Sequence, residues 1–508
     1  MVNLLLSLVV QKEFNSDIVQ SIVDRVKPDN LYMLAAQESE LPIFEQFGEC
    51  VLRKNLVHGV YSEEQLDLEH SYPLEDDVIQ YMNRYALDII FQQRRFEAYP
   101  GFPIGDTVDT HYTVYRHNLF FLYNFLKRKQ ITHVYLAAIP HEGYDYMLYY
   151  LCKYLDIPVQ LTHSCFIPPR RFALKDFEKD SPELKAEYDR LLEQYRDADI
   201  ADIPLEGKTK NQFERWSSQE PEQMKPAQMR KDPFVWRLRQ RFGETNIIRV
   251  WRGVLGEDYA KYGVSLKFIA AAFRKIPALI AAIPAAWKRY CFERPVKKES
   301  RRLRNYYQTL TTMPAEGEKY IYFPLQYQPE ATSNPMGGGM YADQVIPLQI
   351  LSKALPEDVK IYVKLHPEQL SLLRTEGYYR EIASIPKVRM IPIEYSTYEL
   401  IKNALAVSCL TGTALWECHF FGAPAIAFGY SVKNMAPFTF PVRTVEDCQR
   451  AVEEIMKKPR REIAKEVKIY AKALHNISFD IADLAKVLPE LIEKFVAETS
   501  DGGRVSEN

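Results

Sequence analysis

Cysteine is scarce in this chain. Seven cysteines are spread over 508 residues, from Cys50 to Cys448, and no two of them form a C-x-x-C pair. A disulfide framework or a zinc finger needs closely spaced or evenly paired cysteines, so neither is expected, and a reducing cytosol is the simplest compartment. The sequence also lacks an H-E-x-x-H motif. We therefore expect neither a bound metal nor a cofactor.

An excess of charge of one sign is also missing. The chain has 65 Lys and Arg against 67 Asp and Glu, a net charge of −2, so no overall basic field indicates a nucleic-acid partner. The apolar start, residues 1–10, is too short to cross a bilayer and lacks the basic region of a signal peptide. We interpret it as a buried strand. A hydrophobic content of 47% predicts a globular chain of two or three domains.

Short apolar runs alternate with helical patterns in two parts of the chain. Residues 1–175 and 318–498 each show this alternation, which is typical of parallel βαβ units. Residues 176–317 form a connector between them, and its polar part, 176–242, is interpreted as a solvated insertion. Residues 499–508 are expected to be a disordered tail. The predicted fold class is α/β, with two Rossmann-like domains that face a cleft.

Two predicted strand ends of the second domain carry groups that suit a phosphate. The run VKIYVKLHP ends at His366 and Pro367, and an imidazole there could hold a phosphate or a leaving group. The segment VSCLTGTALWE lies between a strand and a helix, where small residues and the helix dipole favour an anion. Its polar and small residues are Ser408, Thr411, Gly412 and Thr413. Helix capping is the alternative for both segments.

A third segment, YFPLQYQPEATSNPMGGGMYADQ, runs from a strand into a polar loop. Its Gln326, Gln328 and Glu330 could bind hydroxyl groups of a sugar or nucleoside, and Asp343 opens the next helix. The glycines at 337–339 permit mobility or a close approach of backbone. A flexible surface loop is the alternative.

The first domain places acidic and basic side chains after its strands. In AAIPHEGYDY, His141, Glu142 and Asp145 lie at a strand-to-helix junction, where a carboxylate could act as a general base or as a nucleophile. The alternative is that these acids complement a helix dipole. Arg170 and Arg171 could hold an acidic acceptor, or could be solvated at the surface.

These segments, in this order, resemble the capsule and surface polysaccharide biosynthesis proteins. That family includes the bacterial β-Kdo transferases, which have a GT-B-like pair of Rossmann domains. The resemblance covers residues 130–172 and 318–435, and its strongest part is the ordered trio QPE…DQ, HP and S-x-x-T-G-T-x-x-x-E. It implies a glycosyltransferase that moves a sugar from a nucleotide-activated donor, CMP-Kdo-like by preference, to a surface polysaccharide or lipid-linked glycan.

The same resemblance implies roles for individual residues. The catalytic candidates are Glu142, Asp145 and His366. The donor-binding candidates are Gln328, Glu330, Asp343, His366, Pro367, Ser408, Thr411, Gly412, Thr413 and Glu417. The acceptor-binding candidates rest on their position in the sequence and not on the resemblance; they are His141, Arg170 and Arg171. Two other functions share this architecture. They are a nucleotide-sugar epimerase and a non-catalytic partner in capsule assembly or export.

The basic charge of the chain is concentrated in one stretch. Residues 261–310 contain 12 Lys or Arg and only two acids, Glu293 and Glu299. Apolar residues, among them Ile276 and Trp287, recur there at helical spacing. This pattern is typical of a helix that lies on an anionic membrane. The resemblance to surface polysaccharide enzymes implies that this membrane is the inner face of a bacterial plasma membrane. A helical hairpin packed between the domains is the alternative.

Overall fold

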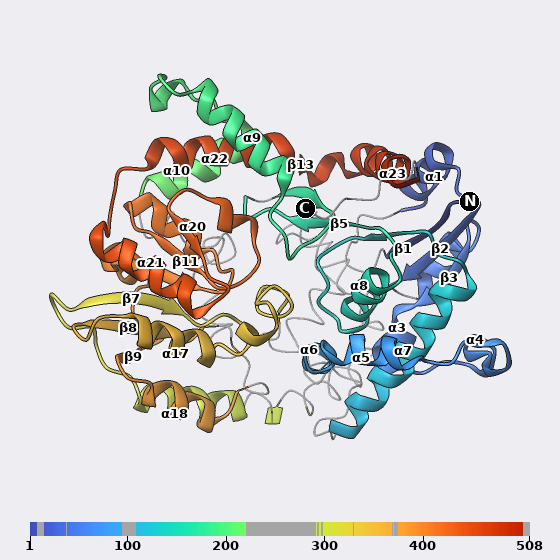
Figure 1. Cartoon of the computed structure of the whole chain (residues 1–508), viewed down its shortest axis with the longest axis horizontal. Coiled ribbons are helices and arrows are strands. Elements are labelled where there is room, and N and C mark those ends of the chain that lie inside the picture. Colours follow the sequence, from blue (N-terminus) through green and yellow to red (C-terminus); the bar gives the residue numbers. More distant parts are fainter. Residues whose placement is uncertain are drawn as a thin grey trace, which may run out of the picture.

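The two predicted halves are two separate sheets, which lie side by side in Figure 1. The computed structural model describes residues 1–7, 15–36, 38–93, 108–167, 169–219, 291, 294–295, 298–328, 330–367, 369 and 374–500. Most of the predicted basic stretch, and the tail from residue 501 onward, lie outside these ranges.

The first sheet has seven strands, and five of them are parallel. Their order is β13 (Phe479–Asp480), β6 (Arg170–Leu174), β5 (Val159–Ser164), β4 (His133–Leu136), β1 (Asn3–Ser7), β2 (Asn30–Ala35) and β3 (Glu49–Leu52). Strands β6 and β13 pair antiparallel at one edge. Strand β1 is buried at all five positions, as expected for a parallel strand that is covered on both faces. The strand order reverses between β1 and β4.

Eight helices are described between β1 and β5. They are α1 (Ser16–Val26), α2 (Leu41–Phe44), α3 (Arg53–His58), α4 (Glu63–Leu66), α5 (Asp76–Asn83), α6 (Ala86–Gln93), α7 (Val108–Arg128) and α8 (Tyr144–Tyr154). Helix α8 is apolar over most of its surface, and nine of its 11 residues are buried. An all-round apolar helix must be covered on all sides, and α8 lies against α5, α6 and α7.

The second sheet has six parallel strands in the doubly wound order. The order is β12 (Thr439–Pro441), β11 (Ala425–Ala427), β10 (Ala406–Cys409), β7 (Lys319–Pro324), β8 (Val359–Lys364) and β9 (Val388–Ile391). Its described helices are α17 (Val345–Ala354), α18 (Glu376–Ser384), α19 (Thr397–Asn403), α20 (Ala414–Glu417) and α21 (Val445–Lys457). The order reverses between β7 and β10, and ligands of open α/β sheets bind beyond such a switch point. The predicted α/β fold class with two Rossmann-like domains is confirmed.

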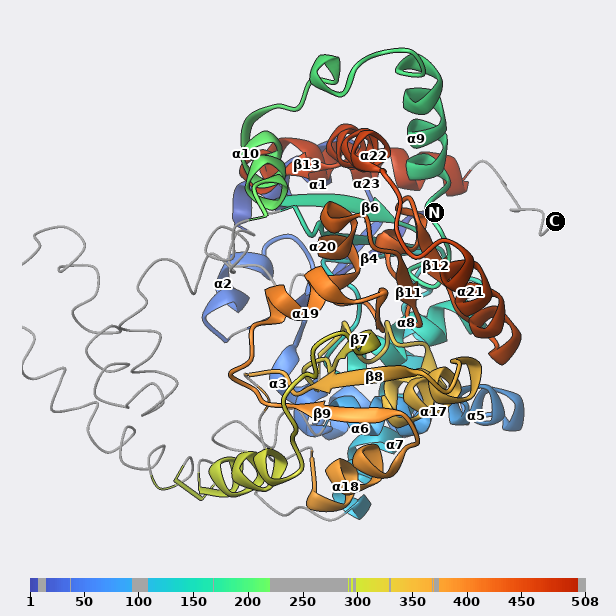
Figure 2. The ribbon, with the colours of Figure 1, turned by 90° about the vertical axis from the view of Figure 1, so that its left-hand side faces the viewer.

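The interpretation of residues 176–242 as a solvated insertion is wrong for their described part. Helices α9 (Pro182–Gln194) and α10 (Gly207–Ser217) pack against α22 (Ala464–Ile477), as Figure 2 shows. Leu184 and Leu191 of α9 are fully buried, and Trp216 of α10 is nearly so. Apolar residues such as Leu184, Tyr188 and Leu191 of α9 recur at helical spacing, but the helices are short and lie within a segment that is polar on average.

The end of the chain returns to the first sheet. The range 318–498 was expected to form one domain, but β13 pairs with β6, and α23 (Leu484–Ser500) packs on α1. Leu488, Ile492 and Phe495 of α23 share one core with residues of β1 and β2. The return is not visible in the hydrophobic pattern, because an amphipathic helix has the same periodicity whichever sheet it covers.

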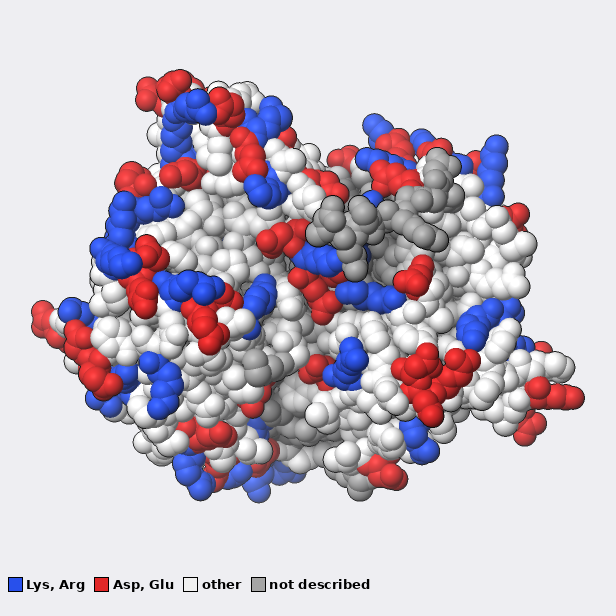
Figure 3. All heavy atoms as spheres, in the orientation of Figure 1, with Lys and Arg blue, Asp and Glu red and all other residues white. Residues whose placement is uncertain are grey.

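The described part of the basic stretch packs against the second domain. Residues 298–309 are helical, and their Leu303 and Tyr307 are buried in the core of the second sheet. The Tyr307 hydroxyl donates to the carbonyl of Ile391 at 2.7 Å. Among the described helices, none is both long and apolar enough to cross a bilayer. On the face drawn in Figure 3, charges of both signs are interspersed.

We predict that Leu488→Ala lowers the free energy of unfolding by about 2–5 kcal/mol, because it opens a cavity between α23 and the first sheet. The matched control is Leu87→Ala on α6, whose leucine is 83% exposed and should cost less than about 0.5 kcal/mol. Guanidinium titration followed by circular dichroism measures both. Equal effects would contradict the assignment of α23 to the first core.

Candidate functional site

The segments that follow the carboxyl ends of the two sheets meet between the domains. Phe166, after β5, lies 4.9 Å from Trp416 of α20, measured between ring centroids. The side chain of Asn334, after β7, donates to the backbone carbonyl of Asp88 in α6 at 3.1 Å. A cavity of about 20 Å³ remains between the domains, with His163 on one wall and Tyr430 on the other. The two switch points therefore face a common, nearly closed crevice.

Two of the predicted motifs come together at the switch point of the second sheet. The backbone N–H of Thr411 donates to the side-chain carbonyl of Gln326 at 3.0 Å. The backbone of Gln326 in turn exchanges two hydrogen bonds with the side chain of Gln344, at 2.7 and 3.1 Å. The loops after β7 and β10 are thus joined by buried amides.

Gly412 must be small at this junction. A Cβ atom there would lie 3.2 Å from Cys409 Sγ and 3.4 Å from Gln326 Nε2. Thr413 is exposed and precedes α20. Helix α20 has only four residues and continues as a 3₁₀ turn, Cys418–Phe421. So short a helix gives the preceding loop only a weak dipole.

Lys433 is a buried cation at this junction that the sequence analysis missed. Its Nζ donates to the carbonyl of Thr411 at 2.9 Å and to Ser431 Oγ at 3.2 Å, and lies 5.3 Å from the ring centroid of Phe166 in the first domain. Burial lowers the pKa of Lys433 to about 8. Burial likewise raises the pKa of Glu417 to about 7, although Thr413 and Lys433 both act to lower it.

The other predicted donor residues mainly hold the loops. The Gln328 backbone N–H donates to Gln369 Oε1 at 3.0 Å, and its side-chain amide donates to the carbonyl of Ala342. Asp343 is exposed and accepts a hydrogen bond from the backbone of Val345, which begins α17. The Glu330 carbonyl accepts hydrogen bonds from the next turn of its own loop.

His366 and Ser408 differ in their position relative to the crevice. His366 follows β8, half-buried, with its ring 5.8 Å from that of Tyr327. Burial and the nearby Lys364 lower the pKa of His366. The carbonyl of Pro367 accepts a hydrogen bond from Arg304 at 2.7 Å. Ser408 is fully buried inside β10 rather than at its end, and its hydroxyl has no hydrogen bond.

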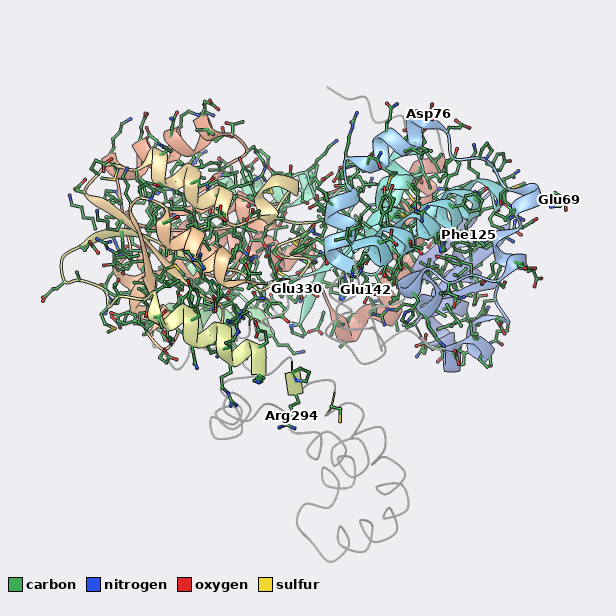
Figure 4. The ribbon with its side chains drawn as sticks, turned by 90° about the horizontal axis from the view of Figure 1, so that it is seen from below. Glu69, Asp76, Phe125, Glu142, Arg294 and Glu330 are labelled. Atoms are coloured by element: carbon green, nitrogen blue, oxygen red, sulfur yellow. The ribbon has the colours of Figure 1, made fainter. Side chains whose placement is uncertain are left out.

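In the first domain, Glu142 lies at the boundary between the halves but is fully engaged. In Figure 4 it lies on the side of the first domain that faces the second. Arg53 of α3 binds both oxygens of the Glu142 carboxylate, one of them at 2.6 Å from Nε, and the Tyr144 hydroxyl donates to it at 3.0 Å. Asp145 accepts the backbone N–H groups of residues 141 and 142 at 2.9 and 2.8 Å. Both carboxylates therefore fix the turn that begins α8.

The three predicted acceptor residues bond to backbone carbonyls. His141 Nδ1 lies 3.1 Å from the carbonyl oxygen of Ile139. Arg170 donates to the carbonyls of His475 and Ser478, next to β13, and Arg171 donates to the carbonyl of Ala137 at 2.6 Å. Arg170 therefore ties the returning chain to the first sheet.

Asp88 is a second group that the sequence analysis missed. It is half-buried in α6, and its Oδ2 lies 3.8 Å from the place of a Cβ on Gly339, in the glycine loop of the second domain. Burial raises the pKa of Asp88 to about 6. No ion pair to Asp88 occurs among the described residues. No motif marks this aspartate, because it becomes part of the crevice only when the domains meet.

Comparisons with known proteins find matches among solved structures only. No protein-family model and no curated protein matches the sequence. Among solved structures, a UDP-GlcNAc 2-epimerase from Methanocaldococcus jannaschii is 11% identical, with 94% of this chain and 99% of that chain covered and a TM-score of 0.25. A glycosyltransferase from Rickettsia africae ESF-5 is 9% identical, with 97% and 98% covered and a TM-score of 0.28. Anabaena Alr3699/HepE, in complex with UDP, is 10% identical, with 97% and 100% covered and a TM-score of 0.27. Similarity at this level does not assign a function.

A larger cavity, of about 940 Å³, lies away from the crevice. Its lining comes from α10, α19 and the start of α22, and includes Lys402, Arg460 and His419. Helix α19 precedes β10, so this cavity lies toward the amino end of that strand. Within the described ranges, no three His, Cys, Asp or Glu side chains are grouped to hold a metal ion.

We predict that Arg53→Met destabilises the fold by about 3–5 kcal/mol, because it leaves the buried carboxylate of Glu142 without its cation. Adding Glu142→Gln should recover part of the loss. The control is Arg25→Met, whose exposed pairs with Glu490 and Glu493 are worth less than about 1 kcal/mol. Urea denaturation measures all three variants, and a small loss in Arg53→Met would argue against a structural role for the pair.

Proposed function

We propose that this protein is a glycosyltransferase that uses a nucleotide-activated sugar, with the donor held at the switch point of the second sheet. The observation that supports the proposal most is Lys433, a buried cation beyond the ends of β10 and β11, at a position where open α/β sheets bind ligands. A buried ammonium is costly unless a counter-charge is supplied. The phosphate of a nucleotide supplies that charge.

The leaving group of such a reaction gains negative charge as the glycosidic bond breaks. The crevice, with a cavity of about 20 Å³, must open to admit a nucleotide. Once it closes around the donor and excludes water, Lys433 stabilises that charge strongly, because electrostatic interactions are then little screened. The carboxyl group of Glu417 is partly protonated near neutral pH, so it repels the phosphate less than an ionised acid would and can donate a hydrogen bond. His366 follows β8 at the same edge of the sheet, and we propose that it also binds the donor.

An acceptor hydroxyl needs a base in the first domain. Glu142 and Asp145 remain candidates, although their oxygens already accept bonds from Arg53 and from backbone N–H groups. Asp88 is better placed for this role, because it faces the glycine loop and its pKa of about 6 suits proton transfer near neutral pH.

The finer identity of the substrates rests on the sequence resemblance. We propose a CMP-Kdo-like donor and a surface polysaccharide or lipid-linked acceptor, reached at the inner membrane face through residues 261–310. If CMP stabilises the protein and UDP does not, that result will support this donor class. Turnover of a nucleotide sugar without any acceptor would instead indicate an epimerase.

We predict that Lys433→Met abolishes nucleotide binding. At about 100 times its Kd a nucleotide stabilises the wild-type fold by about 2.7 kcal/mol, and CMP and UDP are tested by thermal shift. The control is Lys402→Met, which removes an exposed lysine from the larger cavity. Loss of binding in Lys402→Met but not in Lys433→Met would move the nucleotide to that cavity and overturn the proposal.

The same site predicts a pH dependence. Lys433 is charged below its pKa of about 8 and neutral above it, so nucleotide affinity should fall as pH rises from 7 to 9.5. A bound anion moves the midpoint upward, because it favours the charged lysine. In Lys433→Arg, which stays charged, isothermal titration calorimetry should show a smaller fall in affinity over this range, because only the ionisation of Glu417 then opposes binding.

We predict that Asp88→Asn lowers kcat by about 100-fold or more, with little change in the Kd of the nucleotide. In the wild type, kcat should fall as pH drops through about 6, because protonation removes the base. The control is Asp76→Asn, at the start of the neighbouring helix α5. An Asp88→Asn enzyme with unchanged kcat and an unchanged acid limb would exclude Asp88 as the base.

A further inference from the structure

Arg374 is a buried cation on the other side of the second switch point. It follows β8 and precedes α18, and only 7% of its surface is exposed. Its Nε and Nη2 are both buried without a hydrogen bond. The nearby hydroxyl of Tyr378 is also buried without a partner. Each such group loses its water on folding, and a guanidinium loses the most.

The aromatic ring of Tyr378 compensates only part of this cost. The Arg374 Cζ lies 4.1 Å from the centroid of that ring, which is a cation–π contact. Burial is the main cause of the raised pKa of Tyr378, and the nearby Asp343 and Glu381 raise it further. In the described part of the chain, however, neither acid forms an ion pair with Arg374. Among the residues that the structure describes, the charge of Arg374 therefore has no direct counter-ion.

The two unpartnered nitrogens define the shape of the missing partner. Nε and Nη2 lie on one edge of the planar guanidinium, and their N–H bonds point in parallel. That edge matches the two oxygens of a carboxylate or a phosphate in a bidentate contact. The Tyr378 hydroxyl is a third donor beside the same group.

Arg374 is too far from Lys433 to bind the same phosphate. Lys433 follows β11 and Arg374 follows β8, which are three strand positions apart in the order β11-β10-β7-β8. At about 4.8 Å per strand, the two positions differ by roughly 14 Å across the sheet. Both nevertheless lie at the carboxyl edge, on opposite sides of the switch point.

We propose that Arg374 and Tyr378 form a second anion-binding site, for a carboxylate or phosphate group, at the β8 end of the crevice. The anion site itself does not depend on the proposed function, and only the identity of the molecule that bears the anion rests on it. If the donor lies at the switch point, the anion belongs to its sugar, and the sugar is an acid rather than a neutral hexose.

The test uses the full chain in the Lys433→Met background, so that the proposed nucleotide phosphate site is silent. The probes are inorganic phosphate, D-glucuronate and, as a neutral match, D-glucose, each followed by thermal shift in low-salt buffer. We expect stabilisation by an anion and none by glucose. A response to glucuronate alone identifies a carboxylate site, and a response to phosphate, alone or together with glucuronate, identifies a site for phosphate-sized anions.

Three further variants identify the residues. Arg374→Met should lose the response and melt at a higher temperature than its parent without ligand, because it removes a buried unpaired charge. Tyr378→Phe should weaken anion binding about tenfold. Arg380→Met, on the exposed face of α18, should change neither quantity.

Two outcomes overturn the proposal. One is a parent that responds to no anion. The other is an Arg374→Met variant that keeps the full response, which would leave Arg374 as a packing partner of Tyr378. Neither outcome depends on nucleotide binding in the wild type, so failure here is distinguishable from failure of the proposed function.

Discussion

The contacts between Trp416 and its aromatic neighbours fix the position of the second domain against the first. Trp416 is fully buried, and its ring centroid lies 4.9 Å from Phe166 of the first domain, 5.9 Å from Trp216 of α10 and 5.8 Å from Tyr470 of α22. Aromatic rings bury large areas and prefer such inclined geometries. Because Trp416 follows Thr413 by three residues, anchoring it also fixes the loop that carries Thr411.

The ionisable side chains around this closed crevice are removed from water, and this burial explains their shifted pKa values. Burial is the first cause of the lowered pKa of Lys433 and of the raised pKa values of Glu417 and Asp88. All three shifts move the groups toward neutral pH, where they exchange protons readily. The same burial makes Lys433 and Arg374 costly to the free protein. Their retention at one edge of one sheet is what suggests a ligand with two separated negative groups.

The sequence was sufficient to predict features that depend on local pattern. Buried parallel strands such as β1 and β7 are continuous apolar runs, so the two sheets could be predicted, and Gln326 and Thr411 were expected at strand ends that do meet. Features that depend on assembly could not be predicted. Asp88 and Arg374 belong to no motif, Glu142 gains its partner from a residue 89 positions earlier, and α23 has the pattern of any amphipathic helix. The apolar residues of α9 and α10 were overlooked because the composition of the whole segment is polar.

The packing of α23 on α1 also constrains how the chain is made. Strand β1 is synthesised before the other described elements of the first half, and α23, which packs on the same face, is synthesised after all of them. Until α23 is made, α1 covers that face only in part, whereas the strands of the second sheet are complete by residue 441. Since domains fold as units during synthesis, the half whose synthesis begins first is the half whose core is completed last.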